Sequence, residues 1–242
     1  MKFIVRTRDV NSIRVDTMMA LNEMNADYGI KVHPKGLTFA EFHNFIFADL
    51  KKNELYCFLD DDIVPDAQIY IMEKYLLNHP ELTAVCGVAR ANNNKVMMIQ
   101  SLCIKKSFNF ATCIIRGSFL HDIIIPSYLE CSEDDWVRKE MNADGKKYEV
   151  MNEFSFDHLS DDWENKFLKG IEWHTANATL HYMNNGRVID EICSFNGTWK
   201  GIEEYAKTLY DKISRIDRKL ASRTVIAVRQ GFSDYEHKLK NR

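Results

Sequence analysis

The sequence has little of what marks a secreted, membrane-spanning or repetitive protein. Its six cysteines show no CxxC spacing, and four of them lie in apolar runs. This pattern indicates small buried side chains in a reducing compartment rather than disulfides or a zinc site. No signal peptide precedes the strand-like segment at Lys2, and no apolar run approaches the ~20 residues that cross a bilayer. We therefore expect a cytoplasmic protein with no integral membrane segment.

The chain also lacks a large charge imbalance, which argues against a general binder of polyanions. Its 242 residues have a net charge of −3 and are 45% apolar, enough for one large domain or a domain with an appendage. The charge is uneven, because residues 200–242 carry 11 Lys and Arg against 6 Asp and Glu. This basic C-terminal region either packs on the domain as an amphipathic helix or meets an anionic surface. For the second case, peripheral membrane contact and a modified-DNA acceptor stay open.

Strand-like and helix-like patterns alternate early in the chain, and hairpin-like strands appear in the middle. Thr38 and Glu41 form a capping-box pattern at the start of one predicted helix. Together the patterns predict an α/β sheet of mixed direction. The predicted strands are 2–5, 30–32, 56–59, 82–88, 96–104, 108–115, 148–156 and 225–228. The predicted helices are 12–24, 38–50, 65–79, 133–142, 161–169, 171–183 and about 201–221.

Three consecutive carboxylates, Asp60, Asp61 and Asp62, follow the short apolar run from Tyr56 to Leu59. Unpaired charges are too costly to bury in a core, so these residues belong to a loop at the carboxyl end of a strand. Ligands bind at that edge in open α/β sheets. One Asp is enough to cap the helix that follows, so three indicate a further role. Clustered carboxylates suit a hard divalent cation and a phosphate ligand.

Two later stretches carry similar chemistry. Glu133, Asp134 and Asp135 open a predicted helix just before Trp136, and His158 follows a predicted strand. Acidic residues are common in a helix's first turn because the helix dipole favours them there. A lone histidine is usually structural or merely exposed. Taken with Asp60–Asp62, however, one acidic group is suited to hold a metal, another to accept a proton, and His158 to be a third ligand.

These stretches, in this order, resemble the GT-A class of nucleotide-sugar glycosyltransferases, especially family-2-like inverting enzymes. The resemblance covers about residues 1–160. Phe58 to Asp62 with Pro65 resembles the DxD motif, Glu133-Asp134 resembles the xED motif, and His158 stands where many members have a metal-binding histidine. Three further positions are similar to the family, although Arg6 stands where proline is usual: the first strand end at Val5-Arg6-Thr7-Arg8, Asn44 on the helix before DxD, and the glycine loop at Arg116-Gly117.

The resemblance implies a GT-A (Rossmann-like), mixed and mainly parallel sheet flanked by helices over residues 1–165. Residues 166–242 are then a mostly helical extension that packs on this domain or binds the acceptor. It also implies a metal-dependent, inverting transfer of a sugar from a nucleotide-diphosphate donor to an acceptor hydroxyl. The donor is UDP-, GDP- or dTDP-linked. The acceptor stays open between a glycan, a lipid-linked acceptor and modified DNA.

The same resemblance assigns roles to residues. Asp62 and His158 would hold Mn²⁺ or Mg²⁺ on the donor diphosphate, with Asp60 on the metal or the ribose. Asp134 would be the catalytic base, with Asp135 and Glu133 as alternatives. The remaining residues fall into two groups: Thr7, Arg8, Arg6, Asn44, Asp60 and Asp61 on the nucleotide-sugar, and Arg116, Gly117 and Trp136 on the acceptor side.

Two other readings stay open. Asp60-x-Asp62 after an apolar strand also resembles the nucleophile loop of haloacid-dehalogenase-like phosphohydrolases, in which the first Asp attacks phosphorus and the second is the acid/base. The chain is alternatively a non-catalytic protein that binds a nucleotide-sugar or a glycan.

Overall fold

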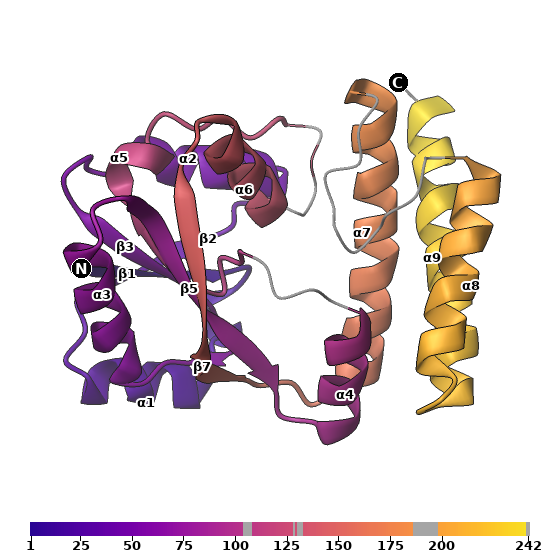
Figure 1. The fold of residues 1–242 in the computed structure, drawn as a ribbon, viewed down its shortest axis with the longest axis horizontal. Helices are drawn as coiled ribbons and strands as arrows, with labels where there is room; N and C mark the ends of the chain where they lie inside the picture. The colour runs from indigo at the N-terminus through magenta and orange to yellow at the C-terminus, as the bar shows by residue number, and fades with distance from the viewer. Residues whose placement is uncertain (104–107, 128, 130–132, 186–197, 241–242) are drawn as a thin grey trace. The chain divides into compact units, whose positions relative to one another are not determined.

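The computed structural model describes residues 1–242 except 104–107, 128, 130–132, 186–197 and 241–242. The chain forms two compact units, each described here by itself (Figure 1). The sheet unit comprises Met1–Asn92, Lys106–Ser127 and Glu133–Leu159, and the helical unit comprises Asn93–Lys105, Tyr128–Ser132 and Ser160–Arg242. That residues 166–242 pack on the sheet domain or bind the acceptor stays a prediction.

The sheet unit is built on one mixed sheet, which in the described residues has seven strands in the order β2-β1-β3-β6-β5-β7-β4. Pairs β1–β2, β1–β3 and β5–β7 are parallel, and pairs β3–β6, β5–β6 and β4–β7 are antiparallel. The mixed α/β prediction is confirmed. The strands are β1 (Lys2–Thr7), β2 (Tyr28–Val32), β3 (Leu55–Asp60), β4 (Ile63–Val64), β5 (Leu82–Ala91), β6 (Thr112–Arg116) and β7 (Lys147–His158).

Helices cover both faces of this sheet because its side chains alternate in direction. On one face, Cys57 and Leu59 share a core with α1 (Val15–Glu23) and α3 (Gln68–Asn78). On the other face, the Phe58 ring packs edge-to-face with Phe47 of α2 (Phe39–Ala48) and at a tilt with Phe110. Helix α6 (Glu133–Ala143) contacts α2 as well, while α5 (Gly117–Leu120) follows β6.

Helix α2 begins where the sequence predicted. The Thr38 hydroxyl accepts a hydrogen bond from the Glu41 backbone N–H, and the Glu41 carboxylate accepts one from the Thr38 backbone N–H. This confirms the capping box, which satisfies two N–H groups that a helix start would otherwise leave unpaired. The cap fixes the helix rotation, so that His43, Ile46 and Phe47 are buried.

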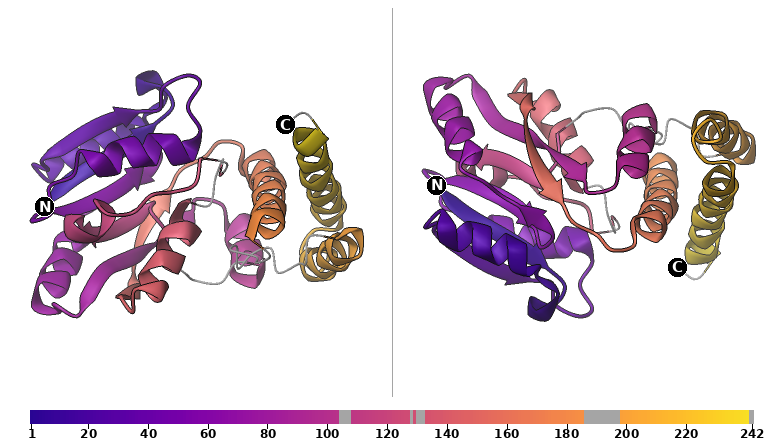
Figure 2. Two further views of the ribbon diagram at one scale, coloured as in Figure 1. Left: turned by 90° about the horizontal axis from the view of Figure 1, so that it is seen from above. Right: turned by 90° about the horizontal axis from the view of Figure 1, so that it is seen from below.

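The helical unit contains α4 (Asn94–Cys103), α7 (Trp163–Asn185), α8 (Trp199–Ile213) and α9 (Arg218–Lys240). Figures 1 and 2 both show α7 and α9 side by side, and the two helices contact each other extensively. Its own apolar core joins all four helices, including Ile99 of α4, Ile171 of α7, Ile202 of α8 and Val228 of α9. Among the described residues, no helix combines the length and the apolar character needed to cross a bilayer.

Several element predictions were wrong, and helix packing explains why. Residues 96–104 were predicted as a strand, but 94–103 form α4, where Asn93 caps Val96 and the buried Val96 and Ile99 lie one turn apart. Residues 225–228 lie inside α9, with Val228 buried and Ile226 exposed. The β-branched residues favoured strands locally, but the helical core overrode that preference. Helices 161–169 and 171–183 are a single α7, and 201–221 is broken between α8 and α9.

Candidate active site

The candidate site lies at the carboxyl edge of the sheet, where three distant segments meet. Strands β1 and β3 pair in parallel with Arg6 opposite Asp60, so both strand ends reach this edge. The short β4 then pairs antiparallel with the end of β7, Ile63 opposite His158. The Leu159 backbone N–H also donates to the Asp62 carbonyl at 2.8 Å. The strand order thus brings His158 beside the carboxylates although almost 100 residues separate them.

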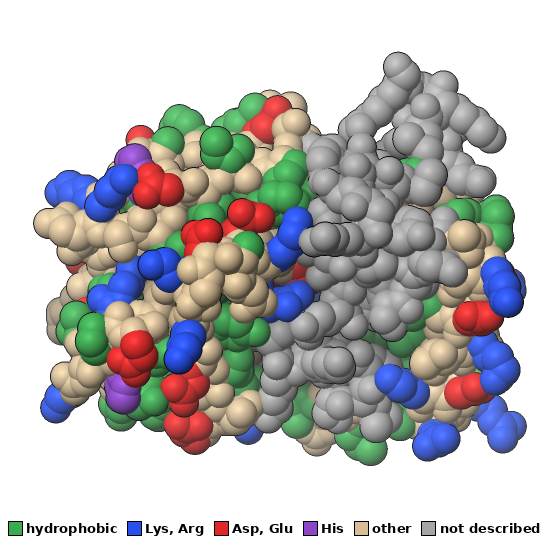
Figure 3. All heavy atoms as spheres, turned by 45° about the horizontal axis from the view of Figure 1, so that its top comes forward, with side chains coloured by type: hydrophobic (Ala, Val, Ile, Leu, Met, Phe, Trp, Pro, Cys, Tyr) green, Lys and Arg blue, Asp and Glu red, His purple; other side chains and the backbone are tan. Residues whose placement is uncertain are grey.

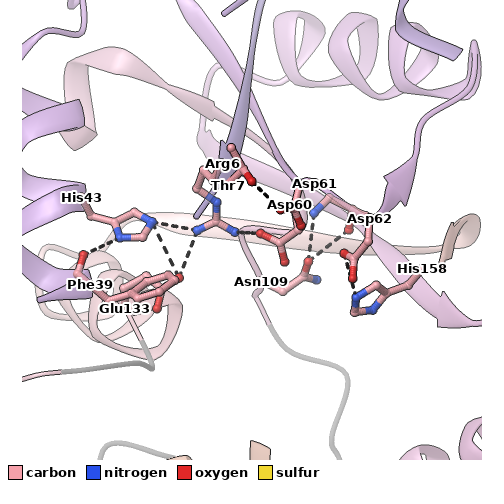
Figure 4. A network of polar contacts seen from close by, with 11 residues as sticks. Arg6, Thr7, Phe39, His43, Asp60, Asp61, Asp62, Asn109, Glu133 and His158 are labelled. Atoms are coloured by element: carbon pink, nitrogen blue, oxygen red, sulfur yellow. Dashed lines mark hydrogen bonds and ion pairs between the residues drawn. The ribbon is translucent and has the colours of Figure 1, made fainter. Parts of the chain in front are cut away.

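Each carboxylate of the triplet has a different partner (Figure 4). Asp60 accepts a hydrogen bond from the Arg6 guanidinium at 2.5 Å. Asp61 accepts from the Thr7 hydroxyl at 2.6 Å and from the Ser12 hydroxyl at 2.9 Å. Asp62 Oδ1 lies 3.1 Å from His158 Nε2. The alternating direction of side chains explains the first two pairings, since Arg6 and Asp60 face α2 while Thr7 faces the segment before α1.

Arg6 is the centre of a buried cluster on the α2 face. One guanidinium nitrogen donates to His43 Nε2 at 2.8 Å and to Glu133 Oε1 at 3.0 Å, while the other holds Asp60. The guanidinium carbon lies 5.5 Å from the centre of the Phe110 ring. The Arg6 side chain is only 7% exposed and His43 is fully buried. The cluster joins β1, α2, the β3 end and the start of α6.

Burial determines the protonation of this cluster. Burial, together with the charge of Arg6, lowers the pKa of His43 to about 4, so the ring is neutral near pH 7. Its Nδ1 lies 2.8 Å from the Phe39 carbonyl, which can only accept, so Nδ1 carries the proton and Nε2 accepts from Arg6. Burial alone would raise the pKa of Glu133, but its interactions with His43 and Arg6 and its backbone hydrogen bond outweigh burial, and the pKa is lowered. Glu133 is therefore ionised and paired with Arg6.

The other two α6 carboxylates differ in their surroundings. Asp135 is buried and accepts from Arg138 at 3.1 Å, within the same helix. Asp134 is partly exposed, and its Oδ1 accepts from the Asp135 backbone N–H at 2.9 Å. Glu133 is held by Arg6. Of the three, Asp135 is buried and Glu133 is paired with Arg6, whereas Asp134 is partly exposed.

The Asp62–His158 pair fits a metal ion. Two ligands at neighbouring corners of an octahedron with bonds of about 2.1 Å lie about 3 Å apart, which matches the 3.1 Å between these two atoms. The carboxylate suits Mg²⁺ or Mn²⁺, whereas an imidazole is a ligand that transition metals accept. Within the described ranges, no three His, Cys, Asp or Glu side chains converge to hold an ion by themselves. Oxygens of a bound diphosphate would have to complete the coordination.

Two predicted acceptor-side residues lie at the opposite edge of the sheet. Because β6 runs antiparallel to β3, Arg116 pairs with Leu55 at the start of β3, far from Asp60. The Arg116 guanidinium donates to the carbonyls of Leu76 and Leu82 near the end of α3. At Gly117, a Cβ would lie 2.3 Å from the Lys51 carbonyl oxygen, so this glycine permits close backbone packing. Both positions have structural contacts, and the predicted acceptor-side role of Arg116 and Gly117 stays a prediction.

Three other predicted residues have contacts that do not by themselves define a substrate role. Asn44 brackets the Ile125 backbone, donating to its carbonyl at 2.7 Å and accepting from its N–H at 2.8 Å. This ties α2 to the segment after α5 and does not place Asn44 at a nucleotide. The Trp136 indole donates to the Ile124 carbonyl at 3.1 Å, and Arg8 lies 5.5 Å from the Phe39 ring centre.

Sequence reasoning missed two members of the cluster, His43 and Phe110. His43 lies on the apolar face of a helix, where a histidine usually indicates only core packing. The feature of the sequence that could have revealed this cluster was Arg6 itself. An arginine at the end of an apolar strand is buried with its strand and requires partners, because an unpaired buried charge is very costly.

Comparison with known proteins places the fold in a class. No family model matches the sequence, and no curated protein matches it. Solved structures with a similar fold include glycosyltransferases, and the chain has their mixed α/β GT-A fold.

Three of these structures illustrate the likeness. The mannosyltransferase PcManGT from Pyrobaculum calidifontis, in complex with GDP-Man and Mn²⁺, has a TM-score of 0.54 at 10% identity over 93% of this chain and 74% of its own. Glucosyl-3-phosphoglycerate synthase from Mycobacterium tuberculosis, with phosphoglyceric acid, scores 0.51 at 10% identity over 79% and 81%. TarS 1–349 from S. aureus with UDP scores 0.50 at 10% identity over 100% and 91%. At such identities, the likeness concerns the fold.

Proposed function

We propose that this chain is a metal-dependent glycosyltransferase that moves a sugar from a nucleotide-diphosphate donor to an acceptor hydroxyl with inversion. The observation that carries the proposal is the Asp62–His158 pair at the carboxyl edge of a GT-A sheet. Asp62 and His158 would hold Mn²⁺ or Mg²⁺. When bound, the ion supplies positive charge that stabilises the leaving diphosphate.

The chain's own residues would perform the remaining steps. The acceptor hydroxyl oxygen forms a bond to the anomeric carbon on the face opposite the diphosphate. The bond from that carbon to the diphosphate oxygen breaks, and its electron pair leaves with the nucleoside diphosphate. Asp134 takes the hydroxyl proton, which requires a single base and gives inversion. Its place in the first turn of α6 favours the ionised carboxylate that this role needs.

The nucleotide side of the site is proposed at the ends of β1 and β3. Thr7 and Asp61 are joined by a hydrogen bond, and Asp60 keeps one carboxylate oxygen beyond the one held by Arg6. That remaining oxygen is suited to accept from a ribose hydroxyl. The Arg6 ion pair also argues against an Asp60 nucleophile of the phosphohydrolase kind, because it withdraws electron density from the carboxylate.

The acceptor is proposed to be a glycan or a lipid-linked molecule, with modified DNA as a further class. The helical unit supports a peripheral contact with an anionic surface through the turn between α8 and α9. Lys212, Arg215, Arg218 and Lys219 are all exposed there. Figure 3 shows Lys and Arg side chains standing at the right of the view, with fewer acidic side chains between them.

A thermal-shift screen of UDP-, GDP- and dTDP-sugars with and without Mn²⁺ tests the proposal. A bound donor raises the melting temperature because it binds only the folded state. We expect one donor class to give a Mn²⁺-dependent shift, and both Asp62→Asn and His158→Ala to abolish that dependence. Asp134→Asn should keep the shift and lose turnover by ~10²-fold or more, since it removes the base. No Mn²⁺-dependent shift with any donor would overturn the proposal.

A further inference from the structure

Arg6 contacts carboxylates from both acidic segments of the candidate site (Figure 4). Asp60 comes from the end of β3, and Glu133 opens α6, the helix that carries Asp134. Arg6 holds Asp60 at 2.5 Å and Glu133 at 3.0 Å, each through a different guanidinium nitrogen. One side chain therefore spans from the donor-facing loop to the helix of the proposed base.

We infer that Arg6 is a positioning residue, whose guanidinium fixes the Asp60–Asp62 loop against the start of α6 and so sets where Asp134 stands relative to the donor. This inference rests on the proposed glycosyltransferase function and names a residue that acts through Asp60 and Glu133 without touching the reacting atoms.

The directions of the guanidinium N–H groups make the contact specific. Both N–H groups of one terminal nitrogen are used, one by His43 Nε2 and one by Glu133. The other terminal nitrogen donates to Asp60, and the planar group keeps these directions fixed relative to each other. A lysine ammonium is a point charge without this fork, so Arg6→Lys preserves the charge but not the geometry.

The surroundings of Arg6 leave it little freedom to move. The side chain is 7% exposed, and the Phe110 ring lies on one side of the guanidinium. His43 is itself held by the Phe39 carbonyl on α2, so the acceptor it offers Arg6 is fixed in place. Removing one partner of such a buried charge pair leaves the others uncompensated. The loop and the helix are thus held together by a rigid contact.

The test compares Arg6 with a second structural arginine. The variants are Arg6→Lys and Arg6→Met, with Arg116→Met as the matched control, because Arg116 binds backbone carbonyls at the opposite edge of the sheet. Amide hydrogen exchange is followed at residues 60–62 and 133–137, and the donor kinetics are measured with Mn²⁺. The exchange measurement needs no donor.

For both Arg6 variants we expect faster exchange at both segments and a kcat lower by about 10²-fold, the order of loss that a small misplacement causes, with donor KM within about 3-fold. Arg116→Met should instead speed exchange near the end of α3 and leave exchange at residues 60–62 and 133–137 at the wild-type rate. Should Arg6→Met fail to fold, Arg6→Lys carries the test by itself.

Two results would overturn the inference. One is unchanged exchange at both segments in the Arg6 variants. The other is an equal rise of exchange at these two segments in Arg6→Met and Arg116→Met, which would mean a general loss of stability. If the wild type binds no nucleotide-sugar, the proposed function fails while the exchange measurement still decides whether Arg6 holds loop and helix together.

Discussion

His43 is a neutral, fully buried ring between a permanent cation and a backbone carbonyl. An unfolded chain protonates this residue near pH 6.5, whereas the folded chain resists protonation until about pH 4. Between these values the unfolded state binds more protons, so the stability of the fold must fall as the pH falls. Over that window the loss from this one group is up to about 3 kcal/mol.

We therefore predict that His43→Gln, which does not titrate but offers Arg6 an acceptor, flattens the dependence of stability on pH between 6.5 and 4. Urea unfolding at several pH values measures the free energy of unfolding of both proteins. The slopes of this free energy against pH are compared, because the packing lost with the ring lowers stability equally at every pH. Carboxylates away from this cluster titrate in both proteins alike, so the difference in slope reports His43 together with its neighbour Glu133. Parallel curves for wild type and His43→Gln would contradict the buried neutral ring.

At the scale of elements, two glycines on the α7–α9 pair differ in what surrounds them. A Cβ at Gly231 on α9 would lie 2.2 Å from the Glu172 carbonyl oxygen on α7, whereas a Cβ at Gly170 on α7 meets nothing within 4 Å. Gly231 therefore lets the two helices approach closely. Gly170 only leaves the helix with extra conformational freedom to lose on folding.

We predict opposite effects of alanine at these two positions. Gly231→Ala should lower the free energy of unfolding by about 1–3 kcal/mol, because the helices must separate. Gly170→Ala should raise it by about 0.5–1 kcal/mol through helix propensity. Chemical denaturation of both variants measures the two changes in the free energy of unfolding. If Gly231→Ala is as stable as the wild type, helices α7 and α9 do not approach each other closely at Gly231.

The sequence predicts elements well where local signals and packing agree. The Thr38–Glu41 box gave the start of α2, and the change from apolar residues to carboxylates at Asp60 gave the end of β3. It failed for Val225 to Val228, whose strand-like residues gain more by packing a helix into the core of the helical unit. It could not place Arg116 at either edge of the sheet, because the antiparallel direction of β6 depends on strand order and not on any local pattern.

The carboxylates and the histidine of the candidate site could be picked out from the sequence, but the partner of each side chain could not. Asp60, Asp62, Asp134 and His158 stand out by type and position. The pairing of Asp60 with Arg6 and of Asp62 with His158 follows from which strands are neighbours in the sheet. The roles of these residues in catalysis stay predictions.

At the scale of the whole molecule, the exposed basic side chains that lack acidic partners in the described C-terminal region gather around the turn between α8 and α9. Lys212, Arg215, Arg218 and Lys219 are exposed, and within the described chain none of them has an acidic partner. The nearby Asp217 is taken by Lys95 and by the Leu220 backbone N–H. Deleting the region would strip Leu209, Ile213 and Leu220 from the helical core, so charge substitution is the cleaner perturbation.

We predict that the full chain binds vesicles containing anionic phospholipid, and that changing these four residues to Ser abolishes binding. Basic side chains near an anionic surface act within a Debye length, so binding should weaken steeply with salt. The double variant Lys200→Ser with Lys207→Ser is the control, because these exposed lysines already face Glu204 and Asp211. Vesicle flotation measures both. If the wild type does not bind these vesicles, the prediction is wrong and the turn is an ordinary solvent-exposed surface.

Helix α4 belongs to the core of the helical unit, yet the chain makes it before the last strands of the sheet. During synthesis at roughly 5–20 residues per second, about 5 to 20 s pass between the appearance of Ile99 and that of Ile202. For that time the apolar face of α4 lacks α8, although part of α7 is made earlier. A partly made chain therefore exposes apolar surface that favours aggregation until the last two helices are complete.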